Sequence, residues 1–350
     1  MPAQPAKKTR NAPQNSIWIG FDLGGTKMMA AVYDSKLNLI AKKRKKTKAF
    51  EGVKVGLERV IATIKAALEE AGIDYQRLTG IGMAIPGLLD LDRGVILDAP
   101  NLGWKNVRIR QRLHKVFNCA VTIINDVDAG VYGEYRLGAA RKARCVVGIF
   151  PGTGIGGGCI YEGDIIRGKR NSCLEIGHIQ LQPEGPLCGC GQRGCLEAIA
   201  SRLAIAASAA KAVYRGEAPH LMEISGTDIR NIRSGALAAS IEAGDSAIEQ
   251  IVREAAQWLG IGVSVAINML APDVVLLGGG LVESMPDIFR EVVEETARKR
   301  VMPSFSDSFE VVVAQLGDYA TCTGAAAWAI NSLEPSRVRQ NRKNKDQAIS

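Results

Sequence analysis

Histidine and aromatic residues are scarce in this sequence. Only three of its 350 residues are histidine, and aromatic residues make up 5% of the chain. So few histidines argue against a Ser-His-Asp triad, and no stretch of the chain shows the pattern of one. The low aromatic content, set against 38 glycines, predicts an α/β protein with many tight turns instead of a β-sandwich.

Long apolar runs are also absent. No segment approaches the run of about 18 apolar residues that indicates a membrane-spanning helix. The opening stretch, MPAQPAKKTRNAPQNS, lacks the apolar core of a secretion signal. Five scattered cysteines lie in apolar surroundings, as expected for reduced thiols: Cys119, Cys145, Cys159, Cys173 and Cys322. We therefore expect a soluble, cytoplasmic protein with no membrane partner.

Acidic residues are missing from both ends of the chain. Residues 1–16 carry three basic residues and no acid, and residues 335–350 carry five basic residues and one acid. These polar tails, which we expect to be disordered, account for seven of the eight net positive charges, so a DNA partner is not expected. A third basic run, KKRKKTK at 42–48, is interpreted as a solvated strand end or hairpin. Polyphosphate binding through these basic segments is kept as an alternative.

Glycine, in contrast, marks a turn near the start of the chain. Residues 16–34 read as strand, turn at Gly24–Gly25 and second strand, which predicts a β-hairpin. Backbone amides and the Thr26 hydroxyl of such a hairpin can contact a phosphate, and Asp22 is placed to hold Mg²⁺ through water. A glycine hairpin without a ligand is the alternative.

The same pattern returns about 130 residues later. Residues 144–168 read as strand, turn at Gly152–Gly154 and strand, which suggests a duplicated fold with one phosphate-binding hairpin in each domain. The turn also matches GxGxxG, but a strand follows it where a dinucleotide site needs a helix. Residues 163–169 match GxxxxGK, yet Arg170 stands where Ser or Thr should bind Mg²⁺. A third glycine turn, 278–280, ends a buried strand and could approach a nucleotide.

Two polar positions follow predicted strands. Asp126 ends an apolar strand, where a catalytic base belongs in an α/β protein, although capping of the next helix is the competing explanation. Asn101, in the loop DAPNLGW, could bind a hydroxylated ligand or make an ordinary Asx turn. Helices are predicted over residues 52–73, 107–117, 196–213 and 246–270.

Cysteine and histidine gather in one short segment, residues 175–197. His178, Cys188, Cys190 and Cys195 form a Cys₃His set that suits a tetrahedral zinc site. Glycines between them allow a tight loop. The alternative is a loop with buried or disulfide-bonded cysteines, although a Cys188–Cys190 disulfide would close a strained ring.

Taken in order, these motifs resemble the ROK family (repressors, open reading frames, kinases). The matching segments are DLGGTK at 22–27, IPG at 85–87, APNLGW at 99–104, IND at 124–126, GTGIGGG at 152–158, EIGH at 175–178, CGCGQRGCLE at 188–197 and LGGG at 277–280. The resemblance covers about residues 17–333. It implies a two-domain actin/hexokinase-like (ribonuclease H-like) α/β fold with a duplicated ββ-hairpin/α core and a zinc-bound loop. The N-terminal domain would span 17–125, completed by a helix at about 320–334, and the C-terminal domain 126–319.

The resemblance also implies an activity and its residues. The activity is ATP-dependent phosphorylation of a hexose at its C6 hydroxyl, with ATP between the domains, Mg²⁺ on the phosphates and structural zinc shaping the sugar loop. Asp126 would be the general base. Sugar contacts would come from Gly87, Asn101, Asn125, Asp126, Glu175, His178 and Glu197. Nucleotide contacts would come from Asp22, Gly24, Gly25, Thr26, Lys27, Gly152, Thr153, Gly154, Gly278, Gly279 and Gly280. The family suggests a homodimer or homotetramer.

Several alternatives remain at this point. Glucose is favoured, but N-acetylglucosamine, N-acetylmannosamine, mannose and fructose kinases share nearly all these motifs, and polyphosphate could serve as donor. A sugar-sensing regulator would carry a helix-turn-helix domain, for which about twenty residues ahead of Asp22 are too few. The chain departs from the family at Val127 and Asp128, and the second carboxylate could raise the pKa of Asp126 or cap the helix.

Overall fold

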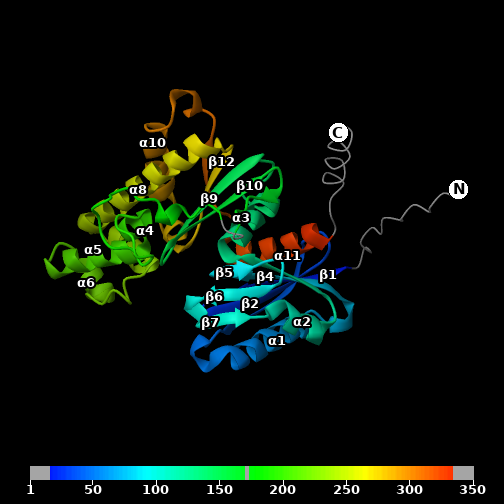
Figure 1. Cartoon of the computed structure of the whole chain (residues 1–350). Coiled ribbons are helices and arrows are strands. Elements are labelled where there is room, and N and C mark those ends of the chain that lie inside the picture. The colour runs from blue at the N-terminus through cyan, green and yellow to red at the C-terminus, as the bar shows by residue number, and fades with distance from the viewer. Residues whose placement is uncertain (1–15, 170–172, 334–350) are drawn as a thin grey trace. The chain divides into compact units, whose positions relative to one another are not determined.

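The computed structural model describes residues 16–169 and 173–333. The chain divides into two compact units (Figure 1): the first holds the residues up to Asp126 and those from Thr321 onward, and the second holds Val127–Ala320. Apart from Ser16, the predicted basic tails lie outside the described residues, as does Arg170. No helix in the described ranges combines the length and hydropathy needed to cross a membrane.

A five-stranded sheet forms the centre of the first unit. Its order is β3-β2-β1-β4-β8, with antiparallel pairing at β3-β2-β1 and parallel pairing at β1-β4-β8. The strands are β1 Ile17–Leu23, β2 Lys27–Tyr33, β3 Leu39–Lys46, β4 Leu78–Ile85 and β8 Ala120–Asn125. The first hairpin is therefore confirmed. Residues 42–46 of the basic run belong to β3 itself, an edge strand whose charged side chains discourage pairing with another chain.

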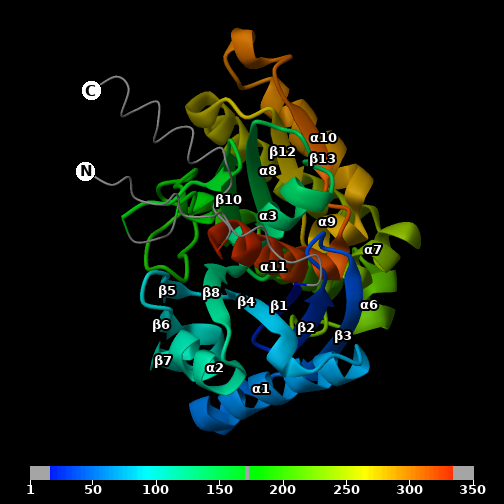
Figure 2. The same cartoon turned by 90° about the vertical axis from the view of Figure 1, so that its right-hand side faces the viewer.

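Helices cover both faces of this sheet (Figure 2). Helices α1 (Gly52–Glu70) and α2 (Ile109–Phe117) bury their apolar sides with one face, and α11 (Ala320–Leu333) lies against the other. Glycine permits this close approach of α11, because a Cβ at Gly20 would lie 1.9 Å from the Cys322 carbonyl oxygen. A small sheet of β5 (Leu88–Asp90), β6 (Val95–Ala99) and β7 (Trp104–Val107) completes the unit.

The second unit repeats the pattern. Its sheet has the order β11-β10-β9-β12-β13, again antiparallel across the first three strands and parallel across the last three. The strands are β9 Cys145–Pro151, β10 Ile155–Tyr161, β11 Asp164–Ile165, β12 Val274–Leu277 and β13 Glu310–Val313. The predicted duplicated hairpin core is thereby confirmed, and the strand after the GxGxxG match confirms that this is no dinucleotide motif.

Helices also cover both faces of the second sheet (Figure 1). Helix α3 (Asp126–Leu137) faces Gly148, where a Cβ would lie 2.2 Å from a Val131 methyl group. Helices α8 (Ser246–Leu270) and α10 (Pro286–Arg298) share the apolar core on the other face. Further helices of this unit are α6 Pro219–Ser225, α7 Ser234–Glu242 and α9 Gly280–Ser284.

One predicted helix is wrong. Residues 196–213 form two helices, α4 (Leu196–Ala200) and α5 (Arg202–Tyr214), which are separated at Ser201. Ser201 is extended, with ψ of 162°, and its hydroxyl accepts a hydrogen bond from the Ala204 amide. A serine cap therefore interrupts a segment whose alanine content alone favours a continuous helix.

Candidate active site and metal centre

The first glycine turn joins β1 to β2 and is held by a threonine. The Thr47 amide donates to the Thr26 carbonyl oxygen at 2.8 Å, and the Thr47 hydroxyl donates to the Gly24 carbonyl oxygen at 2.6 Å. The turn also touches the predicted sugar-binding loop, because a Cβ at Gly25 would lie 2.9 Å from the Asn101 carbonyl oxygen. Thr26 and Lys27 remain exposed.

Predicted site residues meet at one edge of the first sheet. The register places Asp22 beside Ala84, and Ala84 beside Ile124. Asn125 ends β8 and Asp126 begins α3 at the same edge. Carboxyl ends of parallel strands are where α/β proteins bind ligands. The structure therefore brings together the first turn, the turn after β4 that contains Gly87, and the Asn125–Asp126 pair.

Asp128, the second carboxylate of this segment, has a different setting. It is buried in the first turn of α3, and its Oδ1 would lie 3.1 Å from a Cβ at Gly158 in β10. Asp128 is therefore not the N-cap residue that precedes α3, because α3 already begins at Asp126.

The second glycine turn, Gly152–Gly154, joins β9 to β10 and is held by charged residues. Arg202 donates its backbone amide to the Gly152 carbonyl oxygen and its Nη2 to the Thr153 hydroxyl, both at 2.9 Å. The Glu197 carboxylate accepts the Ile155 amide at 2.9 Å.

The third glycine turn, 278–280, adjoins the second turn. The Gly278 amide donates to the Ile149 carbonyl oxygen at 3.1 Å, and a Cβ at Gly279 would lie 3.1 Å from the Pro151 carbonyl oxygen. Two of the three predicted nucleotide-binding turns are therefore neighbours within the second unit.

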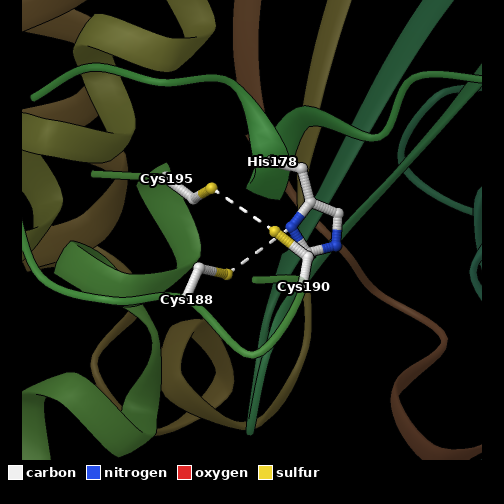
Figure 3. Close-up of side chains that lie close together, drawn as sticks. All are labelled: His178, Cys188, Cys190 and Cys195. Carbon is white, nitrogen blue, oxygen red and sulfur yellow. Dashed lines mark hydrogen bonds between the residues drawn. The ribbon is translucent and has the colours of Figure 1, made fainter. Parts of the chain in front are cut away.

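The four predicted metal ligands converge (Figure 3). The possible ligand atoms of His178, Cys188, Cys190 and Cys195 all lie within 4.8 Å of one another. The Cys188 Sγ to His178 Nδ1 distance is 3.7 Å, and the Cys190 Sγ to Cys195 Sγ distance is also 3.7 Å. A tetrahedral zinc ion with ordinary Zn–S and Zn–N lengths would separate such atoms by about 3.6–3.8 Å. The donor set and its spacing fit zinc.

The chain around the cluster is tightly folded. His178 ends a short 3₁₀ helix, Ile176–His178, and Gly177 packs so closely on β10 that a Cβ would lie 2.2 Å from the Ile155 carbonyl oxygen. All eight cysteines are free thiols, so the disulfide alternative is not realised. Burial raises the pKa of the Cys195 thiol to about 12, whereas a hydrogen bond with the Gln192 backbone lowers the pKa of Cys190. A cation bound here must displace thiol protons.

Glu197 connects the metal cluster to the second glycine turn. One carboxylate oxygen accepts the Ile155 amide, and the other lies 3.7 Å from the Cys188 sulfur. Glu175, another predicted sugar contact, is exposed immediately before the 3₁₀ helix that carries His178. The metal loop and the turn after β9 therefore form one connected assembly.

Two residues that contact the glycine turns were not identified from the sequence. Thr47 lies 23 residues from Gly24, and Arg202 lies 49 residues from Thr153. Neither position belongs to a recognisable motif. The one available signal is the basic residue that opens α5, because a cation at a helix N-terminus is electrostatically unfavourable.

The repeated sheet order and the Cys₃His cluster define a two-domain α/β protein of the actin/hexokinase-like class with a metal-binding loop. The sequence pattern of the ROK family matches residues 18–332. The chain belongs to this family, as its motifs suggested.

Relatives within the family include both enzymes and regulators. A glucokinase of Streptomyces coelicolor is 28% identical over 89% of this chain and 96% of its own length. The crystal structure of a ROK family glucokinase from Streptomyces griseus, in complex with glucose and AMPPNP, superposes with a TM-score of 0.78 at 29% identity and covers 90% of this chain and 99% of that one. A xylose repressor of Caldicellulosiruptor bescii is 27% identical over 90% of this chain and 78% of the repressor.

Proposed function

We propose that this protein is an ATP-dependent hexose kinase that acts on the C6 hydroxyl, with glucose as the preferred acceptor. The observation that carries the proposal is Asp126, a carboxylate at the same sheet edge as the first glycine turn. Similarity to glucokinases, one of them crystallised with glucose and AMPPNP, supports both the reaction and the substrate. The ROK family as a whole supports a sugar ligand more broadly.

The reaction needs alignment and charge neutralisation more than covalent chemistry. Asp126 accepts the proton of the C6 hydroxyl while that oxygen forms a bond to the terminal phosphorus of ATP. The bond from this phosphorus to the bridging oxygen breaks, and ADP leaves with the electron pair. The amides of the glycine turns and Thr26 bind phosphate oxygens, Lys27 adds positive charge, and Asp22 is the residue that would hold Mg²⁺. Mg²⁺, when bound with ATP, neutralises phosphate charge.

His178 of the metal loop is one of the proposed sugar contacts. In Figure 3, one ring nitrogen of His178 faces the thiols, and the other lies on the side of the ring away from them. His178 can therefore ligate zinc and bind a sugar hydroxyl at once, with the ion fixing the ring orientation. We assign the remaining hydroxyl contacts to Gly87, Asn101, Asn125, Glu175 and Glu197.

The direct test is ADP release by the purified, zinc-loaded protein with ATP and one sugar at a time. Glucose, mannose, fructose, N-acetylglucosamine and N-acetylmannosamine are offered separately, and a reaction without sugar measures background hydrolysis. We expect turnover with glucose to exceed turnover with each of the others. Turnover with another sugar would correct the acceptor, whereas binding of sugars without any turnover would favour a regulator, as the similarity to xylose repressors allows.

A second phosphoryl donor, polyphosphate, is favoured by the charge along β3. The antiparallel register pairs Lys27 with Lys46, Met29 with Arg44 and Ala31 with Lys42, so four basic side chains share one face of the sheet with Asp22. This row leads away from the first glycine turn. Absence of turnover with polyphosphate, together with no competition against ATP, would reject this donor.

We further propose a homodimer or homotetramer, which light scattering can measure.

A further inference from the structure

The second glycine turn carries a positive charge that the proposed reaction has not used. Arg202 opens α5, and both its backbone and its guanidinium contact the turn, through the Gly152 carbonyl oxygen and the Thr153 hydroxyl. The guanidinium is permanently charged and offers five N–H donors, of which the Thr153 hydroxyl receives one.

No acid neutralises this charge within the part of the chain that the structure describes. None of the described Asp or Glu oxygens lies within 4.0 Å of the Arg202 guanidinium. Glu197 is the acid that contacts this turn, and its carboxylate is directed to the Ile155 amide and the Cys188 sulfur. The guanidinium therefore has donor capacity for an anion.

The turn itself presents backbone donors beside this cation. The amides of Gly152 and Ile155 are occupied, by the Gly154 carbonyl oxygen at 2.7 Å and by Glu197. The amides of Thr153 and Gly154 make no hydrogen bond to any described residue. Two successive turn amides next to a guanidinium are donors of the kind that bind phosphate.

Helix stability does not explain an arginine here. Arg202 is the first residue of the 13-residue helix α5, where the partial positive charge of the helix repels a cation. Ser201 already caps the helix by accepting the Ala204 amide. A residue that opposes the local electrostatic preference, without a compensating ion pair, is expected at functional sites.

We propose that Arg202 is a further catalytic residue that binds the phosphate chain of the donor nucleotide together with the Thr153 and Gly154 amides. The inference rests on the proposed kinase function. The guanidinium keeps its protons throughout, and its role is to neutralise the charge that moves onto the leaving diphosphate oxygen as the bond to the transferred phosphorus breaks.

The test compares wild type with Arg202→Gln. The glutamine retains a donor for the Thr153 hydroxyl but loses the positive charge and the planar fork of N–H donors that the guanidinium provides. Calorimetry measures the binding of AMPPNP, of adenosine and of glucose to each protein. We expect Arg202→Gln to weaken AMPPNP by about 10–100-fold, and to leave adenosine and glucose binding unchanged. We also expect kcat to fall by about 10²–10³-fold. Arg202→Lys should retain part of the AMPPNP affinity, because it keeps the charge without the fork.

Lys211→Gln is the matched control, because it removes one positive charge from the exposed side of the same helix, nine residues from Arg202. It should bind AMPPNP as wild type does. The melting temperature of Arg202→Gln should equal or exceed that of wild type, since the change relieves an unfavourable charge at the helix start.

Two results would overturn the inference. One is wild-type AMPPNP affinity in Arg202→Gln. The other is an equal weakening of AMPPNP and adenosine with a lower melting temperature, which would make Arg202 a structural brace. If wild type phosphorylates a sugar while Arg202→Gln does so equally well, only this inference fails. If wild type neither binds AMPPNP nor phosphorylates any sugar, the proposed function fails with it.

Discussion

The two units have the same strand order, yet their glycine turns are supported by different means. The first turn is held by the neutral hydroxyl and amide of Thr47, whereas the second is held by Glu197 and Arg202. The cause lies in the connections. Between β3 and β4 the first unit has α1 as its one α-helix, but between β11 and β12 the second unit contains the metal loop and the helices α4 to α8. The repeated strands determine where each glycine turn lies. The longer segment between β11 and β12 supplies the charged residues that hold the second turn.

The last strand of each sheet shows a second difference. β8 ends at Asn125 and is followed by Asp126, whereas β13 ends at Val313 and is followed by Ala314. The chain thus places an acidic residue directly after β8, whereas the residue directly after β13 is an alanine. In the proposed reaction, the first unit supplies the base together with Asp22 and Lys27, and the second unit supplies Arg202 and the zinc ligands.

The largest effect should come from Asp126→Asn. This change keeps the size of the side chain but removes the proton acceptor, so we expect kcat to fall by about 10²–10⁴-fold while glucose binding persists. Steady-state kinetics and calorimetry measure the two quantities. Asp92→Asn, an exposed loop position in the same unit, is the control and should behave as wild type. Turnover close to wild type in Asp126→Asn would remove Asp126 from the role of base.

Loss of the metal should affect the second unit and leave the first unit unchanged. Cys190→Ser removes one of the four zinc ligands. Loss of a residue that only hydrogen-bonds to a ligand lowers metal affinity by about 10–100-fold, so loss of a ligand should lower zinc affinity by at least this factor. Because Glu197 joins the cluster to the second turn, hydrogen exchange should accelerate in residues 152–155 and 176–197. The first turn should exchange as in wild type.

Cys173→Ser provides the control for this experiment, because Cys173 lies outside the four-residue cluster. Its zinc content and exchange should match wild type. Full zinc content and unchanged exchange in Cys190→Ser would refute the metal site. Faster exchange spread evenly over both units would instead refute the claim that the metal cluster supports the second glycine turn and not the first.

Packing of a helix on each sheet gives a third comparison. A Cβ at Gly20 would lie 1.9 Å from a backbone oxygen of α11, whereas a Cβ at Gly148 would lie 2.2 Å from a Val131 methyl group of α3. A side chain can rotate away more easily than a helix backbone can shift. We expect Gly148→Ala to destabilise the protein by about 1–3 kcal/mol and Gly20→Ala by more.

Urea unfolding of both variants beside wild type measures these free energies. Gly235→Ala, where the space around the Cβ is open within 4 Å and the backbone is helical, serves as the control and should not destabilise. Equal destabilisation by the two core substitutions, or a larger effect at Gly148, would contradict the packing argument.

Sequence patterns predicted the parts of the fold that depend on local periodicity. Both hairpins, the duplicated core and α8 follow from the spacing of apolar residues and glycines, and the metal cluster follows from one short segment. The break at Ser201 was missed because a capping serine resembles any other polar residue in an alanine-rich stretch. The extent of β3 was obscured because lysine is uncommon in strands, and pairing with β2 decides that segment. The contacts of Thr47 and Arg202 arise only when segments distant in sequence pack together.

The smallest effect should come from Thr47→Val, which tests the neutral support of the first turn. Valine matches the shape of threonine but cannot donate to the Gly24 carbonyl oxygen, so we expect a loss of about 1 kcal/mol in the free energy of unfolding and a modest rise in KM for ATP. Thr122→Val is a sharp control, because the buried Thr122 hydroxyl has no hydrogen-bond partner among the described residues, so its removal should leave stability unchanged or higher. A larger KM effect from Thr47→Val than from Arg202→Gln would mean that the neutral turn, and not the charged one, dominates phosphate binding.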